Sequence, residues 1–311
     1  MKISILTEPI GSNYNNNEKY GGHKAVTRSL IEGFDKIGFT DYNYNPSNIE
    51  DLAEQVHVLF GADTLIWAIE QKKLGRIKKL TAGPNVVVFS SDKDGLIASP
   101  EVELYLQPSQ WGVEVHNERN NKIIGRCRQW AAGVDLNNFI MNRYKCHNRK
   151  VLIYQKLNLS PILANKVEFL LRNKGYDTVI FRYGSYKFEE YIKTLNEVSF
   201  MVTIGGFESQ GLYMAEAWAM DVPTLCLSSD TIIWDADDGI YKYCSNGRIN
   251  VNAPYLCDLT GAEWRNLHEL MGLIENIDSI LEKTSPRQWV LDNMSDEVCA
   301  RKFLEMVGVE K

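Results

Sequence analysis

Short apolar runs alternate with segments of helical periodicity along the first part of this chain. The runs expected to form strands are Lys2–Leu6, Val56–Phe60, Val86–Phe89 and Glu103–Leu106. Residues 63–80 place apolar side chains on one helical face and end in a basic turn, which is typical of a helix C-terminus. Strands that alternate with helices in this way predict an α/β domain with a parallel sheet.

The same rhythm restarts after residues 137–150, a polar stretch rich in Asn, Arg and Lys that is expected to be a linker. The second set of expected elements comprises strands 151–154, 178–181 and 199–204 and helices 161–174, 186–196, 210–220 and 262–282. Residues 226–260 carry few periodic signals. The pattern therefore predicts two similar α/β domains, over 1–147 and 148–285, and ligands tend to bind in the cleft between such domains.

Composition and charge exclude several classes of protein. The chain has 311 residues and a net charge of −6, which disfavours a large basic face for nucleic acid. No run approaches the ~20 apolar residues of a membrane span, and the N-terminus shows no signal-peptide pattern. A cytoplasmic location is expected, with peripheral membrane contact left open. The six cysteines show no C-x-x-C spacing and are expected to be reduced thiols.

The strongest chemical signal is the stretch Gly205–Pro223, which directly follows an apolar run. It contains two glutamates, Glu208 and Glu216, separated by seven residues, and Gly211 is expected to open a helix between them. The first N–H groups of a helix attract an anion such as a diphosphate, and a carboxylate accepts hydrogen bonds from ribose or sugar hydroxyls. The stretch therefore predicts a nucleotide-sugar site. From the residues alone, a surface helix with two solvated glutamates is the alternative.

The segment from Glu208 to Pro223 resembles the E-x7-E motif of retaining GT-B glycosyltransferases, especially the large family-four-like group. Four shorter segments agree in order within residues 1–225, and they are Gly21-Gly22-His23, Gly83-Pro84-Asn85, Pro108-Ser109 and Ala132-Gly133-Val134-Asp135. The resemblance implies an α/β GT-B fold with two Rossmann-like domains facing across a cleft. The first domain would bind the acceptor and the second the nucleotide-sugar, with the last helices, in 286–311, returning to the first domain.

The resemblance also implies a role for each matching residue. Glu208 would contact the transferred sugar and would form the catalytic set together with His23, and Glu216 would hold the ribose of the donor. The other expected donor contacts are Gly21, Gly22, Lys156, Tyr183, Tyr186, Ser209, Gln210, Gly211 and Leu212. The donor would be a nucleotide-sugar such as a UDP- or GDP-sugar, transferred with retention to a glycan, lipid or protein, with no metal and no cofactor.

Several of these residues have a plainer interpretation. His23 can be a polar residue at a helix N-terminus, and Tyr183 or Tyr186 can be an exposed loop tyrosine rather than a base-stacking one. The remaining histidines lie at neither H-E-x-x-H nor cysteine-paired metal spacing. The acidic cluster Asp235, Asp237 and Asp238 is expected to be a solvated loop rather than a metal site.

Two other functions stay open at this point. The family usually carries an Arg near the cation that follows the first strand of the second domain, but here Lys156 stands without one. That departure motivates a non-catalytic nucleotide-sugar or glycan-binding protein, and a GT-B sugar-nucleotide epimerase would share the fold. A dinucleotide dehydrogenase and a P-loop NTPase are disfavoured, since neither G-x-G-x-x-G after a strand nor a G-x-x-x-x-G-K-[ST] loop occurs.

Overall fold

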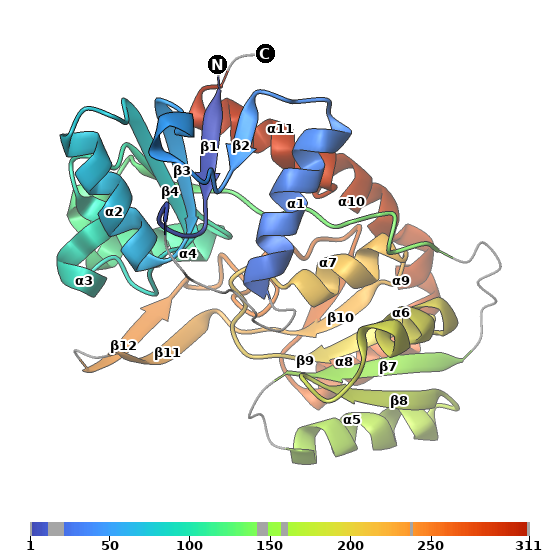
Figure 1. Ribbon diagram of the computed structural model, residues 1–311. Helices are drawn as coiled ribbons and strands as arrows, with labels where there is room; N and C mark the ends of the chain where they lie inside the picture. Colours follow the sequence, from blue (N-terminus) through green and yellow to red (C-terminus); the bar gives the residue numbers. More distant parts are fainter. Residues whose placement is uncertain (1, 12–21, 142–148, 157–160, 237–238, 310–311) are drawn as a thin grey trace. The chain divides into compact units, whose positions relative to one another are not determined.

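The computed structural model of the protein describes residues 2–11, 22–141, 149–156, 161–236 and 239–309 (Figure 1). The chain forms two compact units, one of residues 1–133 with 296–311 and one of residues 134–295. They are called the first and the second unit below. Each contains its own parallel sheet with helices on both faces.

The first unit is built on a six-stranded parallel sheet in the order β2-β1-β3-β4-β5-β6. Its strands are β1 (Ile3–Leu6), β2 (Tyr42–Tyr44), β3 (Gln55–Phe60), β4 (Lys79–Asn85), β5 (Leu104–Gln107) and β6 (Cys127–Gln129). Its helices are α1 (Gly22–Lys36), α2 (Ala62–Lys73), α3 (Asp92–Gly95), α4 (Gln110–Arg119) and α11 (Asp296–Val307), with 3-10 turns at Ile49–Asp51, Leu96–Ala98 and Asn121–Ile123.

Two apolar clusters fill the two faces of this sheet. Helices α1 and α11 cover one face, where Phe34 and Phe303 lie in the core with their ring centroids 5.8 Å apart. Helices α2 and α4 contribute to the other cluster, which contains Leu65 and Val113. Both strand faces are therefore buried, which explains why the strands read as short continuous apolar runs rather than as alternating patterns.

The second unit is built on a five-stranded parallel sheet in the order β13-β10-β9-β7-β8. Its strands are β7 (Lys150–Gln155), β8 (Asp177–Arg182), β9 (Phe200–Ile204), β10 (Thr224–Leu227) and β13 (Gly261–Trp264). Its helices are α5 (Pro161–Asn173), α6 (Phe188–Glu197), α7 (Leu212–Ala219), α8 (Leu267–Glu275), α9 (Ile277–Lys283) and α10 (Pro286–Asn293). An antiparallel ribbon of β11 (Thr231–Ala236) and β12 (Gly239–Cys244) extends beside this sheet (Figure 1).

The α/β architecture confirms the alternating pattern, but three expected elements were wrong. The expected strand Val86–Phe89 is not a strand, because β4 instead runs through Gly83-Pro84 and ends at Asn85. Gly83 lies within this strand. It lets the neighbouring strand come close, since a Cβ there would collide with the backbone of Leu106. The pattern also continued one helix to residue 80, whereas α2 ends at Lys73 and Gly75 follows in the left-handed region, at a φ of 77°.

The third error lies in residues 226–282. The expected helix 262–282 begins with strand β13, in which Trp264 is fully buried, and only then continues as α8 and α9. The stretch 226–260, which showed little periodicity, contains the β11–β12 ribbon. Short strands of mixed polarity give weak sequence signals, and their pairing depends on partners that are distant in the sequence.

The units divide the chain at 133/134 and 295/296, whereas the sequence placed the divisions at 147/148 and 285/286. Helix α10 belongs to the second unit, where the Arg287 guanidinium donates to the carbonyl oxygens of Phe139, at 3.0 Å, and of Ala219. The ring of Trp289, on the same helix, lies 5.3 Å from that of Trp218. Helix α11 alone packs in the first unit, against α1.

Candidate functional site

The order of strands reverses between β7 and β9 in the second unit, and several polar residues follow these strands. Strand β7 pairs with β8 on one side and with β9 on the other. The N–H of Lys156, just after β7, donates to the carbonyl oxygen of Ile204 at 3.0 Å, and the N–H of Tyr183, just after β8, donates to that of Gln155 at 2.9 Å. Ligands of open α/β sheets bind outside the carboxyl ends of the strands at such a switch point.

Lys156 and Glu208 form a largely buried ion pair at this point. The Lys156 Nζ lies 2.5 Å from the Glu208 Oε2, and the two side chains are 22% and 4% exposed. Glu208 is held through its backbone as well, because its N–H donates to the carbonyl oxygen of Val251 at 2.8 Å. Burial raises the pKa of Glu208, and the positive charge of Lys156 opposes that rise. Removing two charges from water is costly, so a pair of this kind is a better indicator of a functional site than of stability.

Tyrosine rings surround the Lys156 ammonium. Its Nζ lies 5.2 Å from the ring centroid of Tyr183 and 5.8 Å from that of Tyr213, within the range of cation–π attraction. Tyr213 stacks on Tyr154 at 4.2 Å, and the Tyr154 hydroxyl lies 2.6 Å from that of Tyr186. Tyr183 is 49% exposed, so one of its faces can receive a ligand.

Tyr186, in contrast, is part of the packing around this site. Its ring stacks on Phe181 at 4.8 Å, and its hydroxyl is bonded to Tyr154. Of the two tyrosines named as base-stacking candidates, Tyr183 therefore has the more open position. Whether either of them contacts a base stays a prediction.

Glu216 borders the same group of tyrosines from helix α7. Its side chain is half-buried. Burial is the main reason that the pKa values of Tyr154 and Tyr191 are raised and that of Tyr186 rises to about 12, and the negative charge of Glu216 adds to the shift in each. Glu208 and Glu216 are therefore both brought to the tyrosine cluster, one from the loop before the helix and one from the helix itself.

The turn that opens α7 presents mainly backbone. Gly211 is the N-cap residue in the left-handed region, with a φ of 80°, and a Cβ there would collide with the side chain of Met214. The Ser209 side chain is exposed, whereas Gln210 is buried and its Nε2 lies 3.8 Å from the Met294 Sδ. The Gln210 side chain is thus used inside the unit, and Leu212 begins the helix.

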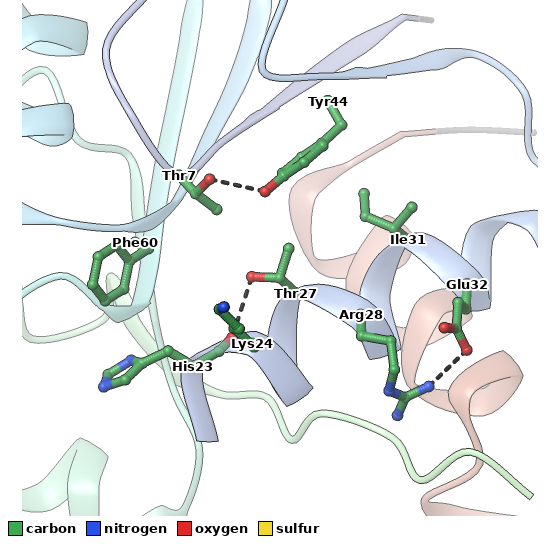
Figure 2. Close-up of a pocket in the computed structure, with 9 residues that line it drawn as sticks. All are labelled: Thr7, His23, Lys24, Thr27, Arg28, Ile31, Glu32, Tyr44 and Phe60. Atoms are coloured by element: carbon green, nitrogen blue, oxygen red, sulfur yellow. Dashed lines mark hydrogen bonds and ion pairs between the residues drawn. The ribbon is translucent and has the colours of Figure 1, made fainter. Parts of the chain in front are cut away.

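A separate cavity of about 420 Å³ lies in the first unit at the equivalent switch point (Figure 2). Its walls come from the ends of β1, β2 and β3 and from α1, and the lining residues are Thr7, His23, Lys24, Thr27, Arg28, Ile31, Glu32, Tyr44 and Phe60. The ring of His23 packs edge-on against Phe60 at 5.0 Å. Gly22 is the first residue of α1, and Gly21 lies outside the described residues.

Three further expectations concern metals, thiols and membranes. Asp235 is an exposed residue of strand β11 rather than of a loop, and Asp237 and Asp238 lie outside the described residues. Five cysteines are free thiols, and Cys146 lies in a segment that the structure does not describe. Within the described ranges, none of the helices has the length and apolar character that a membrane crossing requires.

Sequence reasoning missed Tyr154, Tyr191 and Tyr213, which complete the surroundings of the ion pair. A signal was present for the first of them, because Tyr154 stands two positions before Lys156 and alternate residues of a strand share a face. Tyr213 lies in the first turn of α7, and only the tertiary fold brings it to within stacking distance of Tyr154.

No protein-family model matches the chain, and no curated protein sequence matches it. Solved structures match it in fold over nearly the whole length. The lipopolysaccharide outer core galactosyltransferase WaaB is 12% identical, with 99% of each chain covered and a TM-score of 0.59. HepE from Anabaena, in complex with UDP and glucose, is 9% identical over 100% of each chain, with a TM-score of 0.56.

Sucrose-phosphate synthase from Thermosynechococcus elongatus is 11% identical over 98% of each chain, with a TM-score of 0.53. At these identities the likeness concerns the fold alone. The chain therefore has the two-domain α/β architecture of the GT-B fold, which confirms the predicted fold class.

Proposed function

We propose that the protein is a retaining glycosyltransferase that transfers a sugar from a nucleotide-sugar to a carbohydrate, lipid or protein acceptor. One observation carries the proposal: the Lys156–Glu208 ion pair lies at the switch point of the second unit, and Glu216 borders the same tyrosine cluster. The E-x7-E resemblance assigns donor binding to this very segment. The likeness to a galactosyltransferase and to a protein that holds UDP and glucose supports the same conclusion.

In this proposal the second unit binds three parts of the donor: the diphosphate, the ribose and the base. The Lys156 ammonium and the first N–H groups of α7 stabilise the diphosphate, since a cation and a helix N-terminus both attract phosphate oxygens. Glu216 accepts hydrogen bonds from the ribose hydroxyls. The open face of Tyr183 stacks on the base.

Glu208 acts on the transferred sugar. As the bond between the sugar carbon and the diphosphate oxygen breaks, positive charge develops on the sugar and negative charge on the departing diphosphate. A buried carboxylate stabilises the first and the neighbouring Lys156 stabilises the second, and both effects are strongest in the transition state. These protein groups supply the charge stabilisation, so the proposed reaction uses neither a metal nor a cofactor.

The cavity of the first unit is the proposed acceptor pocket. It combines aromatic walls at Tyr44 and Phe60 with hydroxyl and charged groups, as binding pockets for small organic groups commonly do. His23 lines this pocket and can accept the proton that an acceptor hydroxyl loses. The Gly22 backbone, at the start of α1, would contact the donor diphosphate, as the resemblance implies.

A thermal-shift screen of nucleoside diphosphates and nucleotide-sugars tests the donor part, because a ligand that binds only the folded state raises the Tm. We expect one diphosphate, UDP or GDP, to raise the Tm and the matching nucleotide-sugar to be consumed when an acceptor mixture is added. A screen in which no nucleoside diphosphate shifts the Tm would contradict the proposal.

A non-catalytic binding protein is the second candidate, and one observation favours it. Lys156, the cation assigned to the diphosphate, is already paired with Glu208. Binding of a nucleotide-sugar without any turnover over a broad acceptor panel would select this alternative. Inversion of the donor sugar without an acceptor would instead select an epimerase.

A further inference from the structure

The cavity of the first unit has apolar walls from three different elements. Tyr44 at the end of β2, Phe60 at the end of β3 and Ile31 on α1 all line it (Figure 2). Tyr44 is 44% exposed and therefore offers surface to a ligand. A cavity of about 150 Å³ is enough to hold benzene. The volume of about 420 Å³ is therefore sufficient for a flat ligand with more than one ring.

Two hydroxyl groups are held in a fixed position in this wall. The Thr7 Oγ1 lies 3.0 Å from the hydroxyl oxygen of Tyr44. Asn45 orients the pair, because its Oδ1 accepts from the Thr7 N–H at 2.9 Å and its Nδ2 donates to the Thr7 Oγ1 at 2.8 Å. One of the two hydroxyl protons is used between Thr7 and Tyr44. Among the described residues the pair has no further acceptor, so the second proton can be donated to a ligand.

Most other polar groups of the wall already have partners within the unit. The Thr27 hydroxyl donates to the carbonyl oxygen of His23 at 3.2 Å, and Arg28 pairs with Glu32 at 2.7 Å and with Asp296 at 3.0 Å. A buried hydroxyl without a hydrogen-bond partner is costly, and a sugar ring would bring several hydroxyls into the cavity. The wall therefore favours a ligand with a large apolar surface and few hydroxyls.

We propose that the cavity binds an aryl alcohol, which is a flat aromatic ring with one hydroxyl group. The ring packs against Tyr44, Phe60 and Ile31, since aromatic rings attract one another in stacked and edge-on arrangements. The Thr7–Tyr44 pair donates to the oxygen of the ligand hydroxyl. Tyr44 thus determines specificity through both its ring and its hydroxyl.

The proposal narrows the class of acceptor. An aryl hydroxyl comes from a phenolic small molecule or from a tyrosyl side chain, and not from a sugar. That the bound ring is the group that receives the transferred sugar rests on the proposed function, whereas binding of the ring to the cavity does not.

Strand β2 provides a matched pair of variants. Tyr44→Phe removes the hydroxyl from the cavity and retains the ring. Tyr42→Phe removes a hydroxyl from the same strand at a position that does not line the cavity, where it donates to the Asp35 carboxylate at 2.8 Å. Tyr44→Ala removes the ring itself. Thermal melting of each variant verifies that the protein is folded.

The measurement is ligand-observed NMR titration with 2-naphthol, naphthalene and methyl β-glucoside. We expect the wild type to bind both aromatic compounds, and the glucoside more weakly than either. The ratio of the affinities for 2-naphthol and naphthalene should fall about threefold to tenfold in Tyr44→Phe, since one hydrogen bond is lost, and should stay unchanged in Tyr42→Phe. Tyr44→Ala should weaken the binding of both compounds.

Three results would overturn the proposal: no binding of 2-naphthol to the wild type, tighter binding of the glucoside than of 2-naphthol, or equal changes of the ratio in Tyr44→Phe and Tyr42→Phe. Titration with N-acetyltyrosinamide distinguishes the two sources of the ring. Binding that Tyr44→Phe weakens assigns the aryl hydroxyl to a tyrosyl side chain, and its absence assigns it to a phenolic small molecule.

Failure of this proposal is distinguishable from failure of the proposed function. If 2-naphthol binds through Tyr44 but no nucleoside diphosphate binds, the aryl-alcohol site stands and the glycosyltransferase assignment falls. If a nucleotide-sugar is turned over with a carbohydrate acceptor and 2-naphthol does not bind, the aryl-alcohol site falls and the function stands.

Discussion

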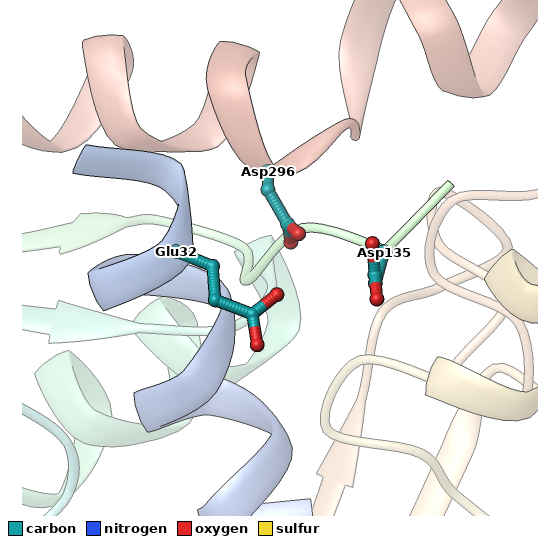
Figure 3. Close-up of side chains that lie close together, drawn as sticks. All are labelled: Glu32, Asp135 and Asp296. Atoms are coloured by element: carbon teal, nitrogen blue, oxygen red, sulfur yellow. The ribbon is translucent and has the colours of Figure 1, made fainter. Parts of the chain in front are cut away.

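Each unit contains a carboxylate that is almost fully buried and ion-paired, and the two sites are built differently. In the first unit, Asp296 is 0% exposed, and its Oδ2 lies 3.0 Å from the Arg28 Nη1 and 2.8 Å from the Lys36 Nζ. Figure 3 shows Asp296 at the start of α11, near α1, which carries Glu32. In the second unit, Glu208 pairs with Lys156, on a loop beyond the sheet.

Packing around the two carboxylates shows what each pair does. A Cβ on Gly33 of α1 would collide with the backbone of Asp296, so α1 and α11 approach each other as closely as glycine allows. Around Glu208, in contrast, Tyr183 and Ser209 remain exposed. In the first unit, Arg28 and Lys36 of α1 pair with Asp296 of α11, and these ion pairs join the two helices that cover one face of the sheet. In the second unit, Lys156 lies beside the exposed ring of Tyr183, and this position is suited to exchanging Glu208 for a ligand.

The largest expected effect is on the structural pair. Asp296→Ala leaves two partly buried cations without their shared carboxylate, and we expect it to lower the free energy of unfolding by about 3–5 kcal/mol. Glu32→Gln is the matched control, because Glu32 pairs with the same Arg28 at 2.7 Å but its side chain is 42% exposed, and its loss should cost less than about 1 kcal/mol. Urea denaturation measures the free energy of unfolding of both variants. Similar losses in Asp296→Ala and Glu32→Gln would contradict a structural role of the buried pair.

Buried groups of the first unit should also make its stability depend on pH. His57 is fully buried, its Nε2 donates to the Gly83 carbonyl oxygen at 2.8 Å, and burial lowers its pKa to about 4. Burial lowers the pKa of His116 to about 4 as well. The unfolded chain binds protons on these histidines below about pH 6.5, whereas the folded chain binds them only below about pH 4. The free energy of unfolding is therefore unaffected by these histidines above pH 6.5 and decreases as the pH falls from 6.5 to 4.

For His57 alone, that loss amounts to about 3 kcal/mol when the pH has fallen below about 4, and to about 2 kcal/mol at pH 5. Urea midpoints at pH 7 and pH 5 measure it. The expected result is a lower midpoint at pH 5 in the wild type and a smaller difference between the two midpoints in His57→Gln. An unchanged pH dependence in His57→Gln would show that other groups dominate the acid sensitivity.

The two glutamates of the second unit should separate in steady-state kinetics with the donor found by screening. Glu208→Gln removes charge that is most useful in the transition state, and we expect kcat to fall about 10²-fold. Glu216→Gln weakens an acceptor for the ribose, and we expect the donor KM to rise about tenfold with a smaller change in kcat. If the two variants lose the same parameter, the separate roles are wrong.

Glu208→Gln should also have a smaller effect, which is favourable rather than damaging, on the binding of nucleoside diphosphate. The substitution removes a negative charge from beside the site of the diphosphate and releases Lys156 from its ion pair. Nucleoside diphosphate should then bind more tightly by about 1 kcal/mol, or roughly fivefold, as for like charges that no longer repel. Calorimetric titration measures this, and weaker binding would indicate that Glu208 supports the diphosphate rather than competing with it.

Three strands of the second sheet, β7, β8 and β9, were predictable from the sequence, because β7 and β9 are continuous apolar runs and each is followed by residues that stop the strand, whereas β13 was expected to be part of a helix. The pairing of Lys156 with Glu208 could not be read in the same way. The two residues are 52 positions apart, and only the strand order β9-β7-β8 places their strands side by side.

Several features were not predictable from the sequence, because they depend on contacts between residues far apart in the chain. The strand expected at Val86–Phe89 lies earlier, because β4 runs through Gly83, where the absence of a Cβ lets Leu106 of the neighbouring strand pack closely. The Asp296 site was not identified at all, since its cations lie more than 250 residues earlier in the chain, at separations of 268 and 260 positions. The ribbon was missed because its two faces mix aromatic, apolar and charged residues and show little of the alternation of a half-buried strand.

The central claim is that Lys156 is the side-chain cation that holds a nucleoside diphosphate. The most direct test is calorimetric titration of UDP and GDP into the wild type, Lys156→Met and Lys166→Met. Lys166 is an exposed lysine on α5 in the same unit and controls for loss of one positive charge. The account predicts that Lys156→Met weakens binding by about 1.5–3 kcal/mol, or roughly 10- to 100-fold, whereas Lys166→Met leaves it unchanged. Equal affinities of the wild type and Lys156→Met would contradict it.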